Sequence, residues 1–178
     1  MRVLAIDPGF ERVGIAVLEK KEGKEVLLYS DCFKTSSKLP FENRLILIGE
    51  ELDRIIGVYK PEALAIETLF FNSNQKTAMR VAEARGVIMY ACVSRGLTLH
   101  EYTPLQVKVA VTGYGKADKE QVSFMTQKLL SIAGDAQYLP VRARTQTGDD
   151  ETDAIALGIT CLASQGIEKG IKYRSTKG

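Results

Sequence analysis

Four acidic residues occupy positions from which a folded chain can bring carboxylates together. Asp7 ends a short apolar segment, and Glu67 ends a second one, Ala63-Leu64-Ala65-Ile66. Asp150 and Asp153 lie three residues apart at the start of a third apolar segment. Strand ends place side chains in the crevice outside a sheet, and residues three apart share a helix face. We therefore expect all four acids to converge on one site.

Converging carboxylates repel one another unless they are protonated or a cation lies between them. Hard oxygen ligands favour Mg²⁺ or Mn²⁺ over softer metals. Two such ions about 3.5–4 Å apart can activate a water molecule and stabilise the leaving 3′ oxygen of a phosphodiester. We expect the four acids to hold two Mg²⁺ ions, for which Mn²⁺ can substitute, and to hydrolyse phosphodiesters without a protein nucleophile.

The rest of the sequence offers little for other catalytic chemistries. The chain has one histidine, His100, in a segment that alternates like a strand, and no Cys-x-x-Cys pair. This disfavours a zinc site and a Ser-His-Asp triad. The three cysteines are widely separated in the sequence, which indicates a reducing compartment. The sequence shows no signal peptide and no apolar segment long enough to span a membrane. We expect a cytoplasmic protein.

Each acid also has a structural interpretation, which the sequence leaves open. Asp7 can stabilise the Pro8-Gly9 turn, and Glu67 can pair with a surface lysine. Asp150 can cap a helix whose N-terminus Asp153 complements, although Asp149 is the best candidate for a simple cap. Taken together, these structural interpretations are less convincing than each is alone, because four unrelated turn, pairing or capping roles would all have to occur at the same end of the fold.

Aromatic and basic residues near the acids are candidate nucleic-acid contacts. Phe70 and Phe71 follow Glu67 in a loop, where they can stack on unpaired bases or fill the core, and we expect one of them outside the core. Lys108, Lys116 and Lys119 can contact phosphates if they lie on the same side as the acids, or can form a solvated face. The net charge of +2 does not decide between these interpretations.

The elements that position these residues form one mixed α/β domain. A length of 178 residues with 45% hydrophobic content suits a single domain. Short turns link strands at 3–7, 13–18 and 26–33 into an antiparallel meander. Further strands are predicted over 63–67 and 97–102, and helices over 41–59, 74–95, from Pro104, from Asp118, and from 149 or 150 to 164. We expect a five-stranded mixed sheet flanked by helices, a domain over 1–166 and a flexible basic tail over 167–178.

The predicted helix over 74–95 carries small residues at every fourth position. Ala78, Ala82 and Gly86 permit close approach of another element. That element is either the chain's own sheet or a second copy of the chain across a twofold axis.

Taken in order, the motifs of this sequence resemble those of the RuvC family of Holliday junction resolvases. They are Ile6-Asp7-Pro8-Gly9 with Gly14 and Val17, Glu67 with Phe70 or Phe71, Ala84-Arg85-Gly86, Thr103-Pro104 with Val107-Lys108, Gly113-Tyr114-Gly115-Lys116-Ala117 with Lys119, and Asp150-x-x-Asp153-Ala154. Each motif is weak alone. Together they cover nearly the whole chain and are specific.

This resemblance implies a ribonuclease H-like fold and a homodimeric, Mg²⁺-dependent endonuclease. Such an enzyme nicks two strands of like polarity symmetrically across a four-way DNA junction in recombination and repair. The implied partners are the junction, the RuvA junction binder and the RuvB motor. In the family's pattern the metal ligands fall on Asp7, Glu67, Asp150 and Asp153, the base-contacting aromatic on Phe70, and the basic residues near the scissile strand on Lys108 and Lys119.

The sequence departs from the family's pattern at two places. Ala5 replaces a usual glycine, and Glu151-Thr152 replaces the small residues usual between the last two acids. Two other functions remain alternatives: a ribonuclease H-like nuclease for structured RNA or RNA–DNA hybrids, and a non-catalytic junction-binding protein. An actin-like ATPase needs a longer, two-domain chain.

Overall fold

The computed structural model describes residues 1–69, 75–132 and 148–164. Within them the elements follow the order β1 (Arg2–Asp7), β2 (Arg12–Lys21), β3 (Lys24–Lys34), α1 (Phe41–Tyr59), β4 (Ala63–Glu67), α2 (Gln75–Val93), β5 (Thr98–Tyr102), α3 (Pro104–Thr112), α4 (Lys119–Leu129), β6 (Leu130–Ile132) and α5 (Asp149–Ser164). The expected helices and the five expected strands are all confirmed. Phe70, Phe71 and the predicted tail lie outside the described residues.

The strands form one mixed sheet in the order β5-β4-β1-β2-β3-β6. The β1–β2 and β2–β3 pairs are antiparallel, which confirms the predicted meander, whereas β4 runs parallel to β1 and β5 parallel to β4. The sixth strand, β6, pairs in parallel with β3 and was not expected. It follows α4 directly, so no turn residues mark its start in the sequence.

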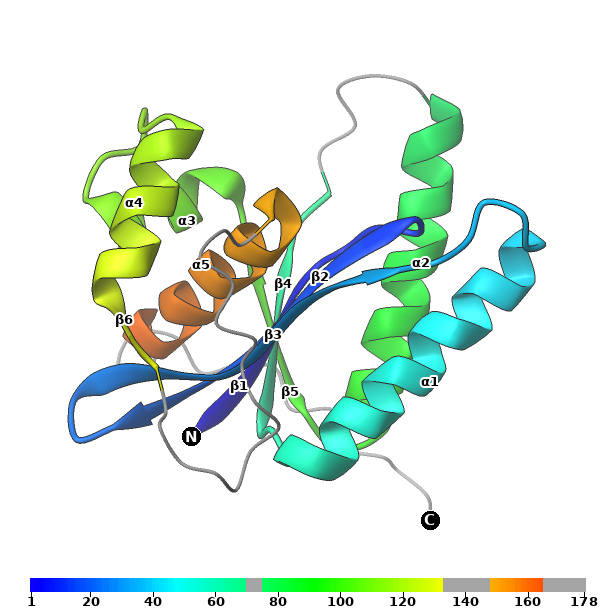
Figure 1. Ribbon diagram of the computed structural model, residues 1–178, viewed down its shortest axis with the longest axis horizontal. Coiled ribbons are helices and arrows are strands. Elements are labelled where there is room, and N and C mark those ends of the chain that lie inside the picture. The colour runs from blue at the N-terminus through cyan, green and yellow to red at the C-terminus, as the bar shows by residue number, and fades with distance from the viewer. Residues whose placement is uncertain (70–74, 133–147, 165–178) are drawn as a thin grey trace, which may run out of the picture.

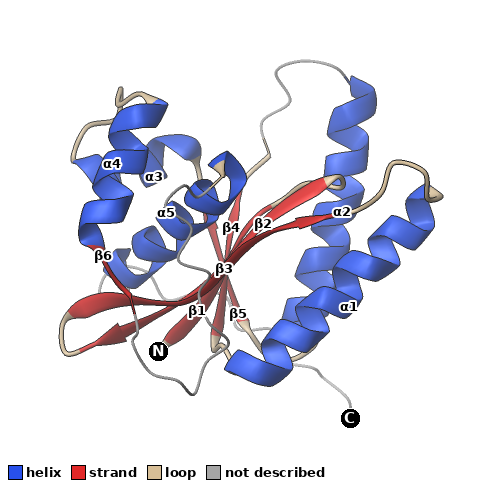
Figure 2. Ribbon diagram, viewed as in Figure 1, coloured by secondary structure: helices blue, strands red, loops and turns tan. Residues whose placement is uncertain are grey.

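Helices cover both faces of this sheet, as Figures 1 and 2 show. Alternation along β1 sends Leu4 and Ile6 into the core beneath α1 and α2, and Val3 and Ala5 into the core beneath α5. The next residue in that second row is Asp7. The Asp7 side chain, at the end of β1, therefore points to the face of the sheet that α5 covers.

Local signals in the sequence set the helix boundaries. The α1 stripe buries Ile48, Leu52, Ile55 and Tyr59, and the helix ends at Lys60, whose left-handed φ of 49° precedes Pro61. The predicted capping box at the start of α3 is present, and a second one begins α4. These caps set where α3 and α4 begin, and both helices pack against α5. No helix of residues 1–69, 75–132 or 148–164 combines the length and apolarity that crossing a bilayer requires.

The helix α5 lies unusually close to the middle of the sheet. A Cβ atom at Gly158 would come within 2.2 Å of Leu18 Cδ1, and one at Gly14 within 2.0 Å of the Asp150 carbonyl oxygen. Both glycines are therefore required by close approach rather than by backbone conformation. This packing brings the acidic first turn of α5 down onto the ends of β1 and β2.

Candidate functional site

Asp7 and Glu67 end adjacent strands on the same face of the sheet. The parallel register pairs Ile6 with Ile66, so the two acids that follow are neighbours. Glu67 continues the row of Ala63 and Ala65, which packs beneath α5 as the row of Asp7 does. The juxtaposition expected from the two strand ends is present.

The first turn of α5 adds the other two acids. Gly14 pairs with Asp7 on one side and with Cys32 on the other. The Asp150 backbone lies directly over Gly14 of β2. The Asp150 side chain therefore begins above β2, between Asp7 on β1 and Cys32 on β3. Asp153, one turn further along α5, shares a pocket with Glu67.

These acids interact electrostatically as one cluster. Burial raises the pKa of Asp7 to about 7, and repulsion from Asp153, Glu67 and Asp150 adds to that effect. Burial, followed by repulsion from Asp153, also raises the pKa of Glu67. The pKa of Asp153 is raised mainly by burial, although Lys119 opposes the shift. Burial and mutual repulsion therefore both disfavour the fully ionised form of the cluster.

Two basic side chains partly neutralise the cluster. Lys119 Nζ lies 3.1 Å from Asp149 Oδ2 and 3.7 Å from Asp153 Oδ2. Arg12 lies against Asp150, with Nη2 2.5 Å and Nε 2.6 Å from Oδ2. Asp149 is the first residue inside α5 and pairs with Lys119, so the expectation that it is a simple cap before the helix was wrong.

The donor chemistry of the cluster fits a hard divalent cation. All four ligand candidates are carboxylates, and burial together with repulsion from its acidic neighbours raises the pKa of Asp7. Yet among the described residues no three His, Cys, Asp or Glu side chains gather around a common point. The four acids are brought into one cluster, but Asp150 is turned toward Arg12.

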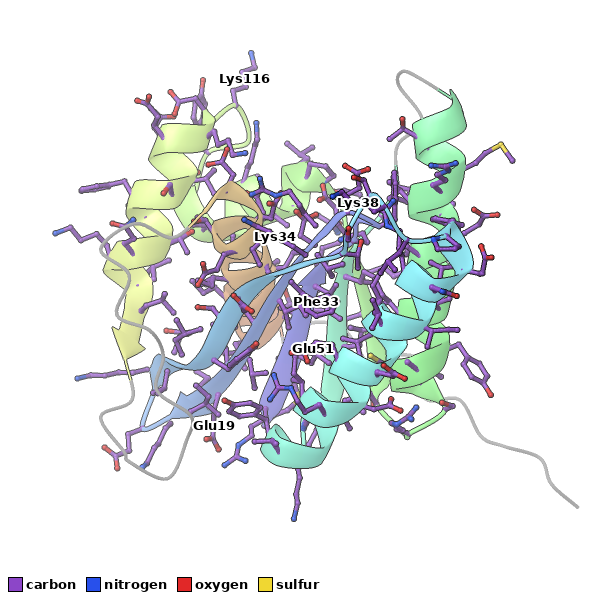
Figure 3. All side chains as sticks on the ribbon, turned by 45° about the vertical axis from the view of Figure 1, so that its right-hand side comes forward. Glu19, Phe33, Lys34, Lys38, Glu51 and Lys116 are labelled. Atoms are coloured by element: carbon purple, nitrogen blue, oxygen red, sulfur yellow. The ribbon has the colours of Figure 1, made fainter. Side chains whose placement is uncertain are left out.

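A pocket of about 280 Å³ opens beside the acids, and its residues come from β4, α3, α4 and α5. Its walls combine charged and apolar side chains: Glu67, Pro104, Val107, Lys108, Lys119, Val122, Asp153 and Leu157. Lys108 and Lys119 thus lie on the acidic side of the molecule, as a phosphate-binding role requires. Lys116 does not line this pocket; Figure 3 shows it extending from the loop between α3 and α4.

Sequence reasoning missed the side chains that hold the strand ends in place. Arg85 of α2 donates from Nε to the Glu67 carbonyl oxygen at 3.1 Å and forms an ion pair with Glu101. Buried Arg44 of α1 donates to the Phe10 carbonyl oxygen at 3.1 Å, which fixes the loop after Asp7. Arg85 falls in a motif noted in the sequence, whereas nothing there marks Arg44.

Arg12 and Cys32 were missed as well, because the sequence contains only part of the signal for them. Arg12 lies two residues before Gly14, and strand alternation places both on the α5 face of β2. Cys32 pairs with Gly14 from β3, and its Sγ lies 3.4 Å from Asp150 Oδ2. The cross-strand partners of Gly14 depend on register, which one sequence does not give.

Comparisons with known proteins agree with this geometry. The sequence model of the family described as "Crossover junction endodeoxyribonuclease RuvC" matches residues 3–161. The chain is 42% identical to the crossover junction endodeoxyribonuclease RuvC of Caldicellulosiruptor saccharolyticus over 92% of this chain and 93% of that one. It is 38% identical to the protein of the same name from Syntrophomonas wolfei over 99% of this chain and 97% of that one.

Solved structures show the same relationship. Thermus thermophilus RuvC superposes with a TM-score of 0.82 at 27% identity, over 97% of this chain and all of that one. The same protein "in complex with Holliday junction substrate" gives a TM-score of 0.82 at 30% identity, over 96% of this chain and 99% of that one. The ribonuclease H-like architecture expected from the sequence is confirmed. The chain belongs to the RuvC family of crossover junction endodeoxyribonucleases.

Proposed function

We propose that this protein resolves Holliday junctions by Mg²⁺-dependent phosphodiester hydrolysis at the cluster of Asp7, Glu67, Asp150 and Asp153. Its membership of the RuvC family supports the endonuclease activity on crossover junctions. The observation that carries the proposed site is the convergence of four carboxylates from β1, β4 and α5, whose burial and mutual repulsion raise the pKa of Asp7 to about 7. A divalent cation among these carboxylates would relieve their mutual repulsion, which favours its binding.

The metal's contribution, when bound, is to activate water and to stabilise the leaving 3′ oxygen. The four acids would hold it, and Mn²⁺ would substitute for Mg²⁺ because both prefer oxygen ligands. Strand pairing with Gly14 and Tyr102 holds the backbones of Asp7 and Glu67, so their carboxylates need little reorganisation. The family's pattern supports this assignment.

Lys108 and Lys119 bind the phosphates of the strand to be cut. Both line the pocket that Glu67 and Asp153 also line. Lys119 is 60% exposed, so it can exchange its carboxylate partners for a phosphate. Lys116, Phe70 and Phe71 are proposed to contact the junction outside this pocket; for the two aromatics the support is the family's pattern alone.

A homodimer gives the two cuts that symmetric resolution needs, and α2 offers the interface. Met79 and Tyr90 are 66% and 76% exposed. They lie on one helix face with Ala82 and Gly86, and a Cβ atom at Gly86 would meet only open space. The small-residue stripe therefore does not pack fully on the chain's own sheet. A second copy at this face places two identical sites about a twofold axis.

Two further assignments rest on the family and on cysteine chemistry. The RuvA–RuvB branch-migration complex is the proposed cellular partner, and family membership is its support. Cys32, Cys92 and Cys161 are free thiols, which supports action in the reducing cytoplasm.

A cleavage assay tests this function directly. The protein is incubated in Mg²⁺ or in chelator with a labelled immobile four-way junction, a matched duplex or an RNA–DNA hybrid. Paired symmetric nicks in the junction alone, lost with chelator, are expected. Preferential cutting of the hybrid would replace the proposal with RNA processing, and binding of several junction sequences without any cutting would replace it with a scaffold role.

A further inference from the structure

Among the described residues, the hydrogen bonds and the ion pair of the Asp150 carboxylate all fall on one oxygen. Oδ2 accepts from Arg12 Nε at 2.6 Å and lies 2.5 Å from Arg12 Nη2. The Cys32 thiol donates to the same oxygen at 3.4 Å. A guanidinium and a thiol from two neighbouring strands thus hold one side chain of the acidic cluster.

These contacts fix the direction in which Asp150 points. Its backbone lies over Gly14, which has Asp7 of β1 on one side and Cys32 of β3 on the other. By meeting Cys32, the carboxylate takes the β3 side, away from the end of β1. In this orientation the described acids interact electrostatically, but no three of them surround a common point.

We propose that Arg12 is a positioning residue that holds Asp150 on the β3 side in the metal-free protein and competes with the divalent cation for it. This inference rests on the proposed metal-dependent function. An oxygen already engaged by a guanidinium cannot also coordinate a cation without giving up part of that contact. The second oxygen, Oδ1, could still accept a cation, but Arg12 holds the carboxylate toward Cys32. Binding of a cation among the acids therefore requires Arg12 to loosen its hold on Asp150.

The exposure of Arg12 makes that release possible. Its side chain is 52% exposed and that of Asp150 is 28% exposed, so the guanidinium can move into solvent and remain hydrated. Ion pairs at this exposure contribute little, and their replacement by a divalent cation is easily driven. Lys119 pairs with Asp153 as Arg12 pairs with Asp150, but its Nζ lies 3.7 Å from Asp153 Oδ2, so this ion pair is looser.

Mn²⁺ binding to the metal-free protein, followed by the electron paramagnetic resonance signal of free Mn²⁺ and without DNA, tests the competition. Arg12→Ala is expected to bind Mn²⁺ about fivefold more tightly than the wild type, the size set by a partly exposed ion pair. Arg12→Lys keeps the charge but loses the two-pronged contact, so an intermediate affinity is expected. Arg54→Ala is the matched control, because Arg54 pairs with Glu51 far from the cluster.

The double variant Arg12→Ala with Asp150→Asn separates competition from a general charge effect. If Arg12 acts through Asp150, removing it in the Asp150→Asn background leaves Mn²⁺ affinity unchanged. Equal or weaker Mn²⁺ binding by Arg12→Ala, or a gain that persists in Asp150→Asn, would overturn the inference while junction cutting by the wild type stands. A wild type that cuts junctions in chelator and binds no Mn²⁺ would remove the proposed metal site and this inference together.

Discussion

Replacing Asp7 by asparagine should stabilise the metal-free protein at neutral and alkaline pH. Asp7 is half-buried and lies among three other acids, and this desolvation and repulsion raise its pKa to about 7 in the native protein, against 3.8 in an unfolded chain. Between these values the native state binds more protons than the unfolded state. The stability of the metal-free wild type therefore falls as pH rises from about 4 to about 7, and the loss is complete above that range.

The magnitude follows from the size of the pKa difference. About three pKa units correspond to about 4 kcal/mol of unfolding free energy at pH 8. At pH 5, where Asp7 is mostly protonated in the native protein, the same difference gives about 2 kcal/mol. The asparagine side chain carries no charge at either pH, so Asp7→Asn regains these amounts, and the gain shrinks as the pH falls.

Urea unfolding in chelator at pH 5 and pH 8 measures this difference. Glu50→Gln, which removes an exposed charge from the middle of α1, is the matched control and should change little at either pH. Adding Mg²⁺ at pH 8 should stabilise the wild type more than Asp7→Asn, because a ligand bound by the native state shifts the equilibrium. The reasoning would be refuted if Asp7→Asn were no more stable than the wild type, or if its gain did not depend on pH.

Three further substitutions test other parts of the account. Lys119→Ala should slow junction cutting and reduce the slope of log K against log salt by about 0.9 in a binding titration; an unchanged slope and rate would leave Lys119 a surface residue. Gly14→Ala should destabilise the protein by about 1–3 kcal/mol in urea unfolding, because its Cβ would press on the Asp150 carbonyl oxygen; wild-type stability would show that α5 is not held this close. Tyr90→Arg, on the exposed face of α2, should shift sedimentation toward the monomer and reduce paired nicks, whereas an unaltered dimer would place the interface elsewhere.

Much of the fold was predictable because its signals are local. The 4-3 spacing from Phe41 to Tyr59 and the Thr103–Gln106 capping box are each contained within a few turns of chain. Asp7 and Glu67 were predictable for a related reason, since strand alternation and the parallel sheet order bring their strand ends together. Whether Phe70 or Phe71 contacts bases stays a prediction, because both lie outside the described residues.

The parts that were not predictable depend on tertiary register. The three-residue strand β6 is too short to show a pattern, and it forms only because β3 offers an edge. Arg12 reaches Asp150 across 138 positions of sequence, because α5 packs directly over Gly14. Buried Arg44 has the appearance of an ordinary charged helix residue until the loop after Asp7 folds over it.

Cleavage of a four-way junction by Asp7→Asn tests the central claim most directly. The variant and the wild type would be compared in Mg²⁺ on one labelled junction, with binding followed by gel shift and nicking by denaturing gel. The account predicts that Asp7→Asn binds the junction as the wild type does and makes no paired nicks, while Glu50→Gln cuts normally. Normal Mg²⁺-dependent cutting by Asp7→Asn would contradict the assignment of the acidic cluster as the active site.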